Sequence, residues 1–588
     1  MPVKSLLGLC IAGFIGNCGP APVDETASAM QRAFAPPPVA RQTLSGNYLA
    51  GQFAQHHRDW ETATRYVGRV LEYDPDNPEL QKRAMILAMG SGETSRAISQ
   101  AREILKTDPQ NVLAILFVTI DSFSRQDYAA TIQTLSTMPE GGMADFVRPL
   151  LLAWAKAGQG KTETDALAEN SPLHAYHAFL IADYLGKTDK IDSYLEKILQ
   201  DTAIDIYELK NIADIYAKHG KTDKAKELYE TILATQPDNE QILTRLARIK
   251  EGKPAASPGD LTPVSSPEQG AAEAIFDMAR VLFSEYSDDS AMVFSRMALH
   301  LNPALSEARI LLANIMVRNN RLDRAISYYR SLTPDDENYI PAQQRAADLL
   351  EREGRSEKAA EILKKLYDQK KDLNTLILTG DMYRRAEDYE SAVKIYNQAA
   401  EALGGNIPKK YWHLLYTRGI AYERLGETER AEKDLKAALS FQPDDPYVLN
   451  YLGYSWANRG ENLEDSLRMI EKAVTLQPDD GYIVDSLGWV LYRMGKHQAS
   501  AETLELAVEL QPYDPTINDH LGDAYWRVGR KREARFQWER ALNYAGEEGN
   551  TSEEGMEEKL RAKLQNGLSE KDPSLKEAKN AGEDPLKR

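Results

Sequence analysis

The chain has 588 residues, of which 71 are Lys or Arg and 89 are Asp or Glu, so its formal net charge is −18. Hydrophobic residues make up 42% and charged residues 27%, which excludes a wholly disordered chain and a polytopic membrane protein. The acidic excess also argues against non-specific nucleic-acid binding, which requires a basic surface. The only cysteines are Cys10 and Cys18, so the rest of the chain has no disulfide framework and no cysteine metal site.

The first eighteen residues have the pattern of a secretion signal. Lys4 supplies a positive charge, and residues 5–16 form an apolar stretch shorter than the ~20 residues that span a bilayer. The sequence IGNC that ends at Cys18 resembles the lipobox of bacterial lipoproteins, although Asn17 departs from the small residue usual there. This resemblance implies a signal peptide over 1–18 and lipidation of Cys18.

The residues that follow predict where the protein is held. Gly19 follows the lipobox-like cysteine, and a residue other than Asp there implies, by the same resemblance, sorting to the outer membrane. Residues 19–43 are rich in Ala and Pro and are expected to be a flexible tether. Two alternatives remain: cleavage after an Ala-Ser-Ala sequence at 27–29, or synthesis starting at Met30 with a cytoplasmic product.

A period of about 34 residues dominates the C-terminal half. Glycines recur in similar surroundings, with steps of 34, 35 and 34, at Gly419, Gly453, Gly488 and Gly522. Prolines recur with steps of 35 and 34 at Pro443, Pro478 and Pro512. A fixed period of this length is the signature of a repeat architecture.

The pattern within each unit resembles the tetratricopeptide repeat (TPR), a hairpin of two helices called A and B. Apolar residues at positions 4, 7, 8 and 11 form one helical stripe, and a small residue at position 8 lets helix B approach closely. Glycine at position 15 suits a left-handed turn, and proline at position 32 ends helix B. We therefore predict an all-α TPR solenoid, in which stacked hairpins share one core.

Weaker copies extend the repeats upstream. Units are predicted to begin near residues 44, 78, 111, 206, 272, 306, 340 and 373, and residues 140–205 are helical but degenerate. Residues 251–270 hold four prolines and three glycines, so we predict a loop or hinge there between two solenoid blocks, 44–250 and 271–545. The charged residues 546–588 are predicted to be a mobile tail with a short helix near 557–567.

Sequence motifs give little support for an enzyme. Residues 155–162 fit a relaxed phosphate-loop pattern that includes Lys161, but the preceding residues are predicted to be helical, whereas a phosphate loop follows a buried strand. His174 and His177 lack a facing carboxylate pair or an HExxH motif, so we predict that the histidines lie on the surface or between helices and form no metal site. No catalytic residue and no cofactor is predicted.

The predicted concave groove carries the functional hypothesis. In the TPR units that this sequence resembles, helix A positions 2, 5, 9 and 12 line the concave face, and position 13 follows them. From those positions we predict a partner-binding groove formed by Tyr416, Tyr447, Asn450, Tyr454, Tyr482, Asp485, Trp489, Tyr492, Arg493, Trp526 and Arg527. Aromatic residues and Arg are favoured at binding hot spots. The alternative is that the aromatic residues pack between repeats.

The lipobox-like start, the long repeat array and the C-terminal block resemble bacterial outer-membrane TPR lipoproteins. That resemblance implies a non-catalytic adaptor that binds a periplasmic carboxyl-terminal processing protease and presents cell-wall hydrolases to it. It also implies protein partners, no nucleic acid, and membrane attachment only through the N-terminal lipid. The alternative is a cytoplasmic TPR regulatory or accessory protein.

Overall fold

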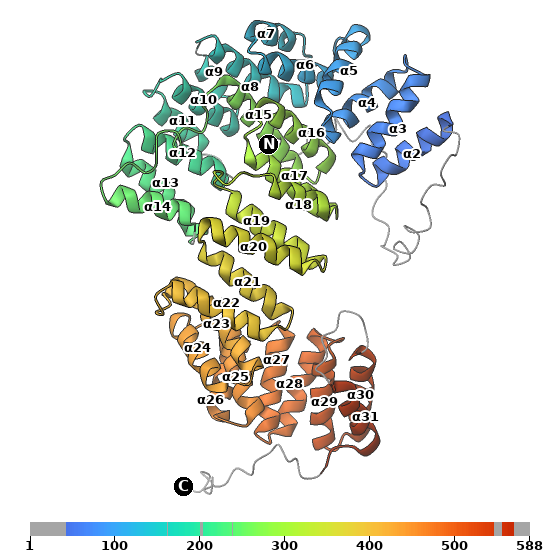
Figure 1. The fold of residues 1–588 in the computed structure, drawn as a ribbon, viewed down its shortest axis with the longest axis vertical. Coiled ribbons are helices and arrows are strands. Elements are labelled where there is room, and N and C mark those ends of the chain that lie inside the picture. The colour runs from blue at the N-terminus through green and yellow to red at the C-terminus, as the bar shows by residue number, and fades with distance from the viewer. Residues whose placement is uncertain (1–42, 162, 200–203, 238, 546–554, 570–588) are drawn as a thin grey trace. The chain divides into compact units, whose positions relative to one another are not determined.

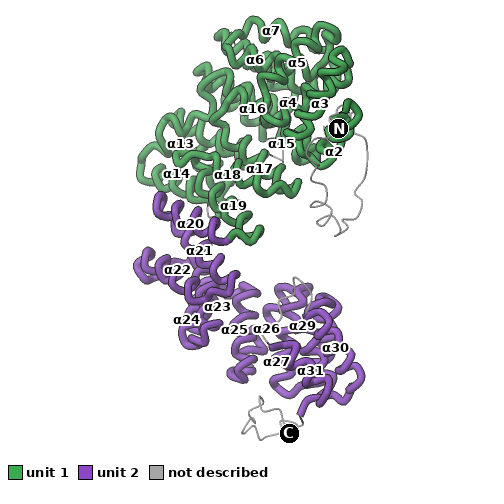
Figure 2. The backbone as a smooth tube through the Cα atoms, turned by 45° about the vertical axis from the view of Figure 1, so that its right-hand side comes forward, with its two compact units in different colours: residues 1–355 green, residues 356–588 purple. Residues whose placement is uncertain are grey.

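The structure is a computed structural model that describes residues 43–161, 163–199, 204–237, 239–545 and 555–569. These residues form helices joined by short connections, and they contain no β-strand (Figure 1). The predicted signal peptide, the tether up to residue 42, Cys18 and Met30 lie outside the described residues. The chain divides into two compact units, residues 1–355 and residues 356–588 (Figure 2).

Unit 1 is built from consecutive antiparallel helices. In its first part these helices are α2 (Leu44–His56), α3 (Trp60–Tyr73), α4 (Pro78–Ser91), α5 (Thr94–Thr107), α6 (Val112–Ser124), α7 (Tyr128–Ser136), α8 (Met143–Gly158), α9 (Thr164–Ala168), α10 (Pro172–Tyr184), α11 (Ile191–Ile198), α12 (Ile206–Lys218), α13 (Thr222–Thr235) and α14 (Glu240–Lys250). After a loop come α15 (Pro267–Ser284), α16 (Asp288–Leu301), α17 (Ser306–Arg318), α18 (Leu322–Arg330) and α19 (Tyr339–Arg352).

Unit 2 continues the same pattern. Its elements are α20 (Ser356–Lys370), α21 (Leu373–Arg385), α22 (Tyr389–Ala402), the 3₁₀ helix η3 (Lys409–Tyr411), α23 (Trp412–Arg424), α24 (Thr428–Phe441), α25 (Pro446–Arg459), α26 (Leu463–Leu476), α27 (Gly481–Arg493), α28 (His497–Leu510), α29 (Pro515–Arg527), α30 (Lys531–Ala545) and α31 (Met556–Asn566). The A helices pack on their own B helices, as α23 does on α24, and α25 and α27 also pack on the next A helix, α27 and α29 respectively.

The predicted all-α TPR solenoid is confirmed. Predicted unit starts near 78, 206, 306 and 373 coincide with the starts of α4, α12, α17 and α21. The turn between helices A and B is left-handed where glycine was expected, with φ of 75° at Gly426, 76° at Gly495 and 86° at Gly529. Glycine meets no steric penalty in this conformation, so it ends helix A without strain.

The chain of unit 1 folds back on itself. Helix α15 packs on α8 and α10, and α16 packs on α4 and α6, so Figure 1 shows both helices inside the arc that α4 to α12 form. Consistent with this position, α15 is buried on nearly every side, including Glu268, Glu273 and Asp277. The inner side of the first helices is therefore covered by the chain itself, which the sequence did not predict.

A buried polar chain fastens α15 to the first layer. The indole N–H of Trp154 donates to Nδ1 of His177 at 3.1 Å, so the Nε2–H of that histidine donates to Asp277, 3.0 Å away. His177 is fully buried and Asp277 is 2% exposed. His177 is thus a hydrogen-bonded core residue between helices, in agreement with the interpretation of the histidines.

The loop before α15 differs from the prediction in its bounds and in its position relative to the two compact units. It covers residues 251–266, because Ser266 caps α15 and Pro267 occupies the first helical position, where a missing N–H costs nothing. The side chains of Ala255, Leu261 and Val264 are buried. The helices on both sides of this loop belong to unit 1, so the predicted division at 251–270 does not coincide with the division at 355/356.

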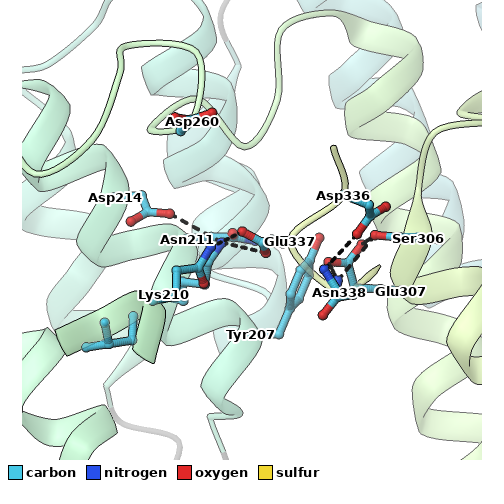
Figure 3. A network of polar contacts seen from close by, with 12 residues as sticks. Tyr207, Lys210, Asn211, Asp214, Asp260, Ser306, Glu307, Asp336, Glu337 and Asn338 are labelled. Carbon is cyan, nitrogen blue, oxygen red and sulfur yellow. Dashed lines mark hydrogen bonds and ion pairs between the residues drawn. The ribbon is translucent and has the colours of Figure 1, made fainter. Parts of the chain in front are cut away.

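A second polar network joins α12 to the segment that precedes α19 (Figure 3). Lys210 Nζ lies 3.4 Å from an Asp214 oxygen and 3.1 Å from a Glu337 oxygen. The amide of Asn338 donates to Glu307 at 3.1 Å, and burial raises the pKa of that glutamate. Ion pairs and hydrogen bonds therefore hold the two passes of the chain together, in addition to apolar packing.

The contact between α15 and α8 gives a test of this fold. A Cβ added at Gly270 would lie 2.3 Å from Cε2 of Trp154. Alanine normally stabilises a helix interior by up to ~1 kcal/mol relative to glycine, but overpacking a core costs roughly 1–3 kcal/mol. We expect Gly270→Ala to lower the free energy of unfolding in urea, followed by circular dichroism. The control Gly259→Ala makes the same change in the open loop and should leave stability unchanged; equal stability of both variants would contradict the fold-back.

Candidate polypeptide-binding face

The candidate site lies on the A helices of unit 2. We call the side formed by positions 2, 5, 9, 12 and 13 of α23, α25, α27 and α29 the A-helix face. Asp445, Asp480 and Asp514 cap the last three of these helices by accepting hydrogen bonds from backbone N–H groups of the first turn. Proline occupies the first helical position of α25 and α29. These local signals fix where each A helix begins and hence which residues share the face.

Two tyrosines of the A-helix face are open to solvent. Tyr447 and Tyr482 are the second residues of α25 and α27, and they are 50% and 55% exposed. Their backbone N–H groups donate to the capping carboxylates at 3.0 Å, so the main chain is fixed while the rings stay available. Of the predicted site residues, these two therefore keep the most accessible aromatic surface.

Other predicted residues of the face are half-buried. Tyr416 lies edge to face against Tyr451, with ring centroids 6.1 Å apart, and burial raises its pKa to about 12. Asn450, Tyr454 and Trp489 are also partly covered by neighbouring helices. These four side chains combine packing within the unit with a remaining accessible surface.

The contact between α27 and α29 is an aromatic and ionic cluster. Trp489 stacks on Tyr492 with centroids 5.0 Å apart and on His520 with centroids 4.2 Å apart. Nδ1 of His520 lies 2.9 Å from an oxygen of Asp485. Burial works to lower the pKa of His520, but the neighbouring carboxylates, Asp485 before Asp519 and Asp523, together raise it, which favours a charged pair.

Three predicted site residues are buried within unit 2. Asp485 is 6%, Tyr492 2% and Arg493 8% exposed. Arg493 donates to the backbone oxygen of Asn458 at 2.6 Å, which joins α27 to α25. Positions 5, 12 and 13 of α27 thus face adjacent A helices. These three residues pack between repeats, which is the alternative to a binding role.

The last two predicted residues contact the C-terminal segment of the chain. The indole N–H of Trp526 donates to the backbone oxygen of Leu568 at 3.2 Å, and Arg527 donates to the backbone oxygen of Ser569 at 2.8 Å. Residues 555–569 are therefore a packed part of unit 2, in contrast to the prediction of a mobile tail, although α31 agrees with the short helix expected near 557–567. The remainder of the predicted tail, 546–554 and 570–588, lies outside the described residues.

Sequence reasoning missed the residues that hold this segment. Lys563 forms ion pairs with Asp519 and Asp523, and Gly567 lies directly against the Trp526 ring. Lys563 and Gly567 each follow an apolar leucine by three residues, and a lysine and a glycine near the end of an apolar pattern are ordinary signals of a helix end. Nothing local in that pattern indicates the helix on which the segment packs.

Residues 155–161 have the helix and turn that the sequence predicted, and not the geometry of a phosphate loop. Residues 155–158 are the last turn of helix α8, and the buried strand that a phosphate loop requires is absent from this described segment. Thr162 lies outside the described residues. In the described parts of the chain, no three His, Cys, Asp or Glu side chains are grouped so that they could hold a metal ion. No described helix combines the length and apolar character needed to cross a membrane.

Comparison with known proteins supports the repeats. Family profiles of the tetratricopeptide repeat match residues 416–481, 211–239 and 485–514. A TPR repeat-containing protein of Pseudomonas aeruginosa is 28% identical over 188 residues, which are 29% of this chain and 29% of that protein. The alignment therefore spans less than a third of that relative's length.

Solved structures also match parts of the chain, with TM-scores below 0.5. The Cut9–Hcn1 hetero-tetramer of the APC/C is 12% identical, with a TM-score of 0.38, covering 92% of this chain and 98% of that chain. MamA of Desulfovibrio magneticus is 24% identical, with a TM-score of 0.26, covering 29% of this chain and 93% of that chain. The chain thus contains tetratricopeptide repeats in both units, a fold that typically provides surfaces for protein partners and is non-catalytic.

The aromatic cluster yields a stability prediction. Trp489 has ring partners on α27 and α29, so Trp489→Ala should lower the free energy of unfolding by about 3 kcal/mol, the usual order for a packed tryptophan. The control Tyr482→Ala, on the same helix but half exposed, should change it by less than about 0.5 kcal/mol. Chemical denaturation of the full chain measures both; a harmless Trp489→Ala would mean that the stack contributes nothing to unit 2.

Proposed function

We propose that the protein is a non-catalytic scaffold that binds partner polypeptides on the A-helix face of unit 2. The observation that carries this proposal is the pair Tyr447 and Tyr482, half exposed at the same position of consecutive repeats. Tyrosine provides a large contact area at a low cost in side-chain entropy, and aromatic residues are enriched at binding hot spots. Tyr416, Asn450 and Tyr454 extend the same face along α23 and α25.

The corresponding A helices of unit 1 are covered, which favours unit 2 as the place where a partner binds. Its first A helices, α4, α6, α8 and α10, are covered by α15 and α16. A partner could reach that side only by displacing helices that bury His177 and Asp277. Displacing them would break these buried hydrogen bonds and expose the apolar residues of α15, so the A-helix face of unit 2 is the more accessible surface.

We further propose that the protein is exported and anchored by a lipid on Cys18 to the periplasmic face of the outer membrane. This part rests on the signal-like residues 1–18 and on the resemblance to TPR lipoproteins. The same resemblance proposes a carboxyl-terminal processing protease and cell-wall hydrolases as the partners. The protein would then hold a substrate near its protease without catalysing a reaction.

A site-specific crosslinker tests the binding face. With a photoreactive phenylalanine in place of Tyr447 or Tyr482, we expect adducts with an extracytoplasmic protease or hydrolase in living cells, identified by mass spectrometry. The matched control is the same replacement at Phe536, which is 58% exposed on helix α30 of the same unit. Adducts at position 536 but at neither tyrosine would place partner binding elsewhere.

Radiolabelled palmitate tests the anchor. If Cys18 is lipidated, the wild-type chain should incorporate label and fractionate with outer membranes, whereas Cys18→Ser should do neither, because it lacks the thiol that carries the acyl group. The repeats should be unaffected, since residue 18 precedes α2, so circular dichroism serves as the control. An unlabelled wild-type chain in the cytoplasmic fraction would support the cytoplasmic alternative.

A further inference from the structure

The C-terminal segment packs on the last repeat of unit 2 through a fixed part and an extended part. Helix α31 is the fixed part: Met556 is 6% exposed and Leu560 is fully buried, and both belong to the apolar core that includes Trp538. Because these side chains complete the core of the last repeat, α31 contributes to folding in the way that a capping helix of a repeat array does.

Lys563 fixes the end of α31 over the A-helix face. Its Nζ lies 2.7 and 2.8 Å from the two oxygens of Asp519 and 2.9 Å from Oδ2 of Asp523. Asp523 also accepts a hydrogen bond from the Trp538 indole at 2.9 Å and is 6% exposed. Burial, followed by repulsion from Asp519, raises the pKa of Asp523 to about 6, so the ammonium group of Lys563 offsets an unfavourable pair of carboxylates.

Residues 567–569 are the extended part, and their contacts involve the main chain. Gly567 has φ 69° and ψ −172°, and a Cβ there would lie 1.9 Å from Cζ2 of Trp526, so the peptide backbone rests on the indole ring. The next two carbonyl oxygens, of Leu568 and Ser569, accept the hydrogen bonds from Trp526 and Arg527. Apart from the need for glycine and the packing of Leu568 on the core, the contacts of this segment are made by its backbone.

Arg527 can serve the repeats and a ligand at once. Its Nε donates to the hydroxyl of Tyr492 on α27 at 3.1 Å, while Nη1 donates to Ser569. The guanidinium fork has five N–H donors in a fixed plane, so the contact with α27 orients the group toward the carbonyl. Unit 2 therefore holds Arg527 in place, and it holds Trp526 through the ring of Trp538, with centroids 5.3 Å apart.

We propose that Trp526 and Arg527 form a binding site for the main chain of an extended, glycine-containing polypeptide, and that residues 567–569 are its intramolecular occupant. A partner that carries such a segment must displace these three residues while α31 stays in place. This inference deepens the proposed function and depends on it for the identity of a natural partner. Short extended segments are commonly captured through backbone hydrogen bonds in this way.

The geometry explains why the occupant is effective although its contacts are few. Lys563 and Leu560 hold α31, so Gly567 is tethered within four residues of a fixed point. A short tether gives an effective concentration in the millimolar range. The apparent affinity for an external peptide is then the intrinsic affinity multiplied by the fraction of molecules in which the site is open.

The test opens the site without changing its donors. In the full chain, Gly567→Val should clash with the Trp526 ring and release 567–569, while α31 keeps its anchors. The probe is a labelled, C-terminally amidated peptide with the sequence AKLQNGLS, residues 562–569, and fluorescence anisotropy measures its binding. We expect Gly567→Val to bind the probe at least tenfold more tightly than the wild-type chain.

Two controls make the result specific. Gln565→Val adds the same side chain at an exposed position of α31 and should bind like the wild type. The probe AKLQNVLS should not bind, and adding Arg527→Ala to Gly567→Val should abolish binding of AKLQNGLS.

Hydrogen exchange at residues 567–569 shows whether Gly567→Val has released the segment, and so distinguishes the ways in which the test can fail. If exchange at 567–569 increases in Gly567→Val but the probe binds no better, the site does not exist as proposed. If exchange is unchanged, the glycine contact does not hold the segment, and the proposal is also overturned. Neither outcome depends on the crosslinks at Tyr447 and Tyr482, so failure of this inference is distinguishable from failure of the proposed function.

Discussion

The close approach of the two helices in each hairpin is the constraint on which unit 2 depends. At position 8 of helix A, a Cβ on Gly488 would lie 2.4 Å from Leu504, and one on Gly522 would lie 2.4 Å from Trp538. Leu504 and Trp538 fill this space and are fully buried. Because protein interiors are close-packed, any larger residue would separate the helices and alter the angle at which the next hairpin stacks.

Stacking places the A helices side by side, and their polar and aromatic residues must then find partners across each boundary. Tyr451 on α25 donates to Glu423 on α23, Arg493 on α27 donates to the α25 backbone, and His520 on α29 pairs with Asp485 on α27. These contacts join each repeat to the next on the side where a partner is proposed to bind. The binding face is therefore also part of the framework, so only side chains beyond these pairs, such as Tyr482, are available to a ligand.

The sequence predicts those features whose determinants are local. The spacing of glycines and prolines gives the repeat, because each residue acts within its own hairpin. The fold-back of α15 was not predicted, since it depends on contacts such as Gly270 with Trp154, which are distant in sequence and carry no periodic signal. In the candidate site, helical periodicity assigns Tyr482 and Tyr492 to one face, but exposure is decided by the neighbouring helix, which leaves Tyr482 55% and Tyr492 2% exposed.

The end of the array combines stability with competition for a ligand. Among the described residues no further repeat follows α29 and α30. Helix α31 covers the apolar core there through Leu560, and its Lys563 pairs with two carboxylates. Residues 567–569 add little buried apolar surface of their own beyond Leu568, and their contacts satisfy donors that a partner's backbone could satisfy equally well. A tighter contact at Gly567 would stabilise the last repeat and weaken partner binding by the same free energy. Because α31 is firmly packed and residues 567–569 are weakly held, a partner's backbone can replace residues 567–569 while α31 still covers the last repeat.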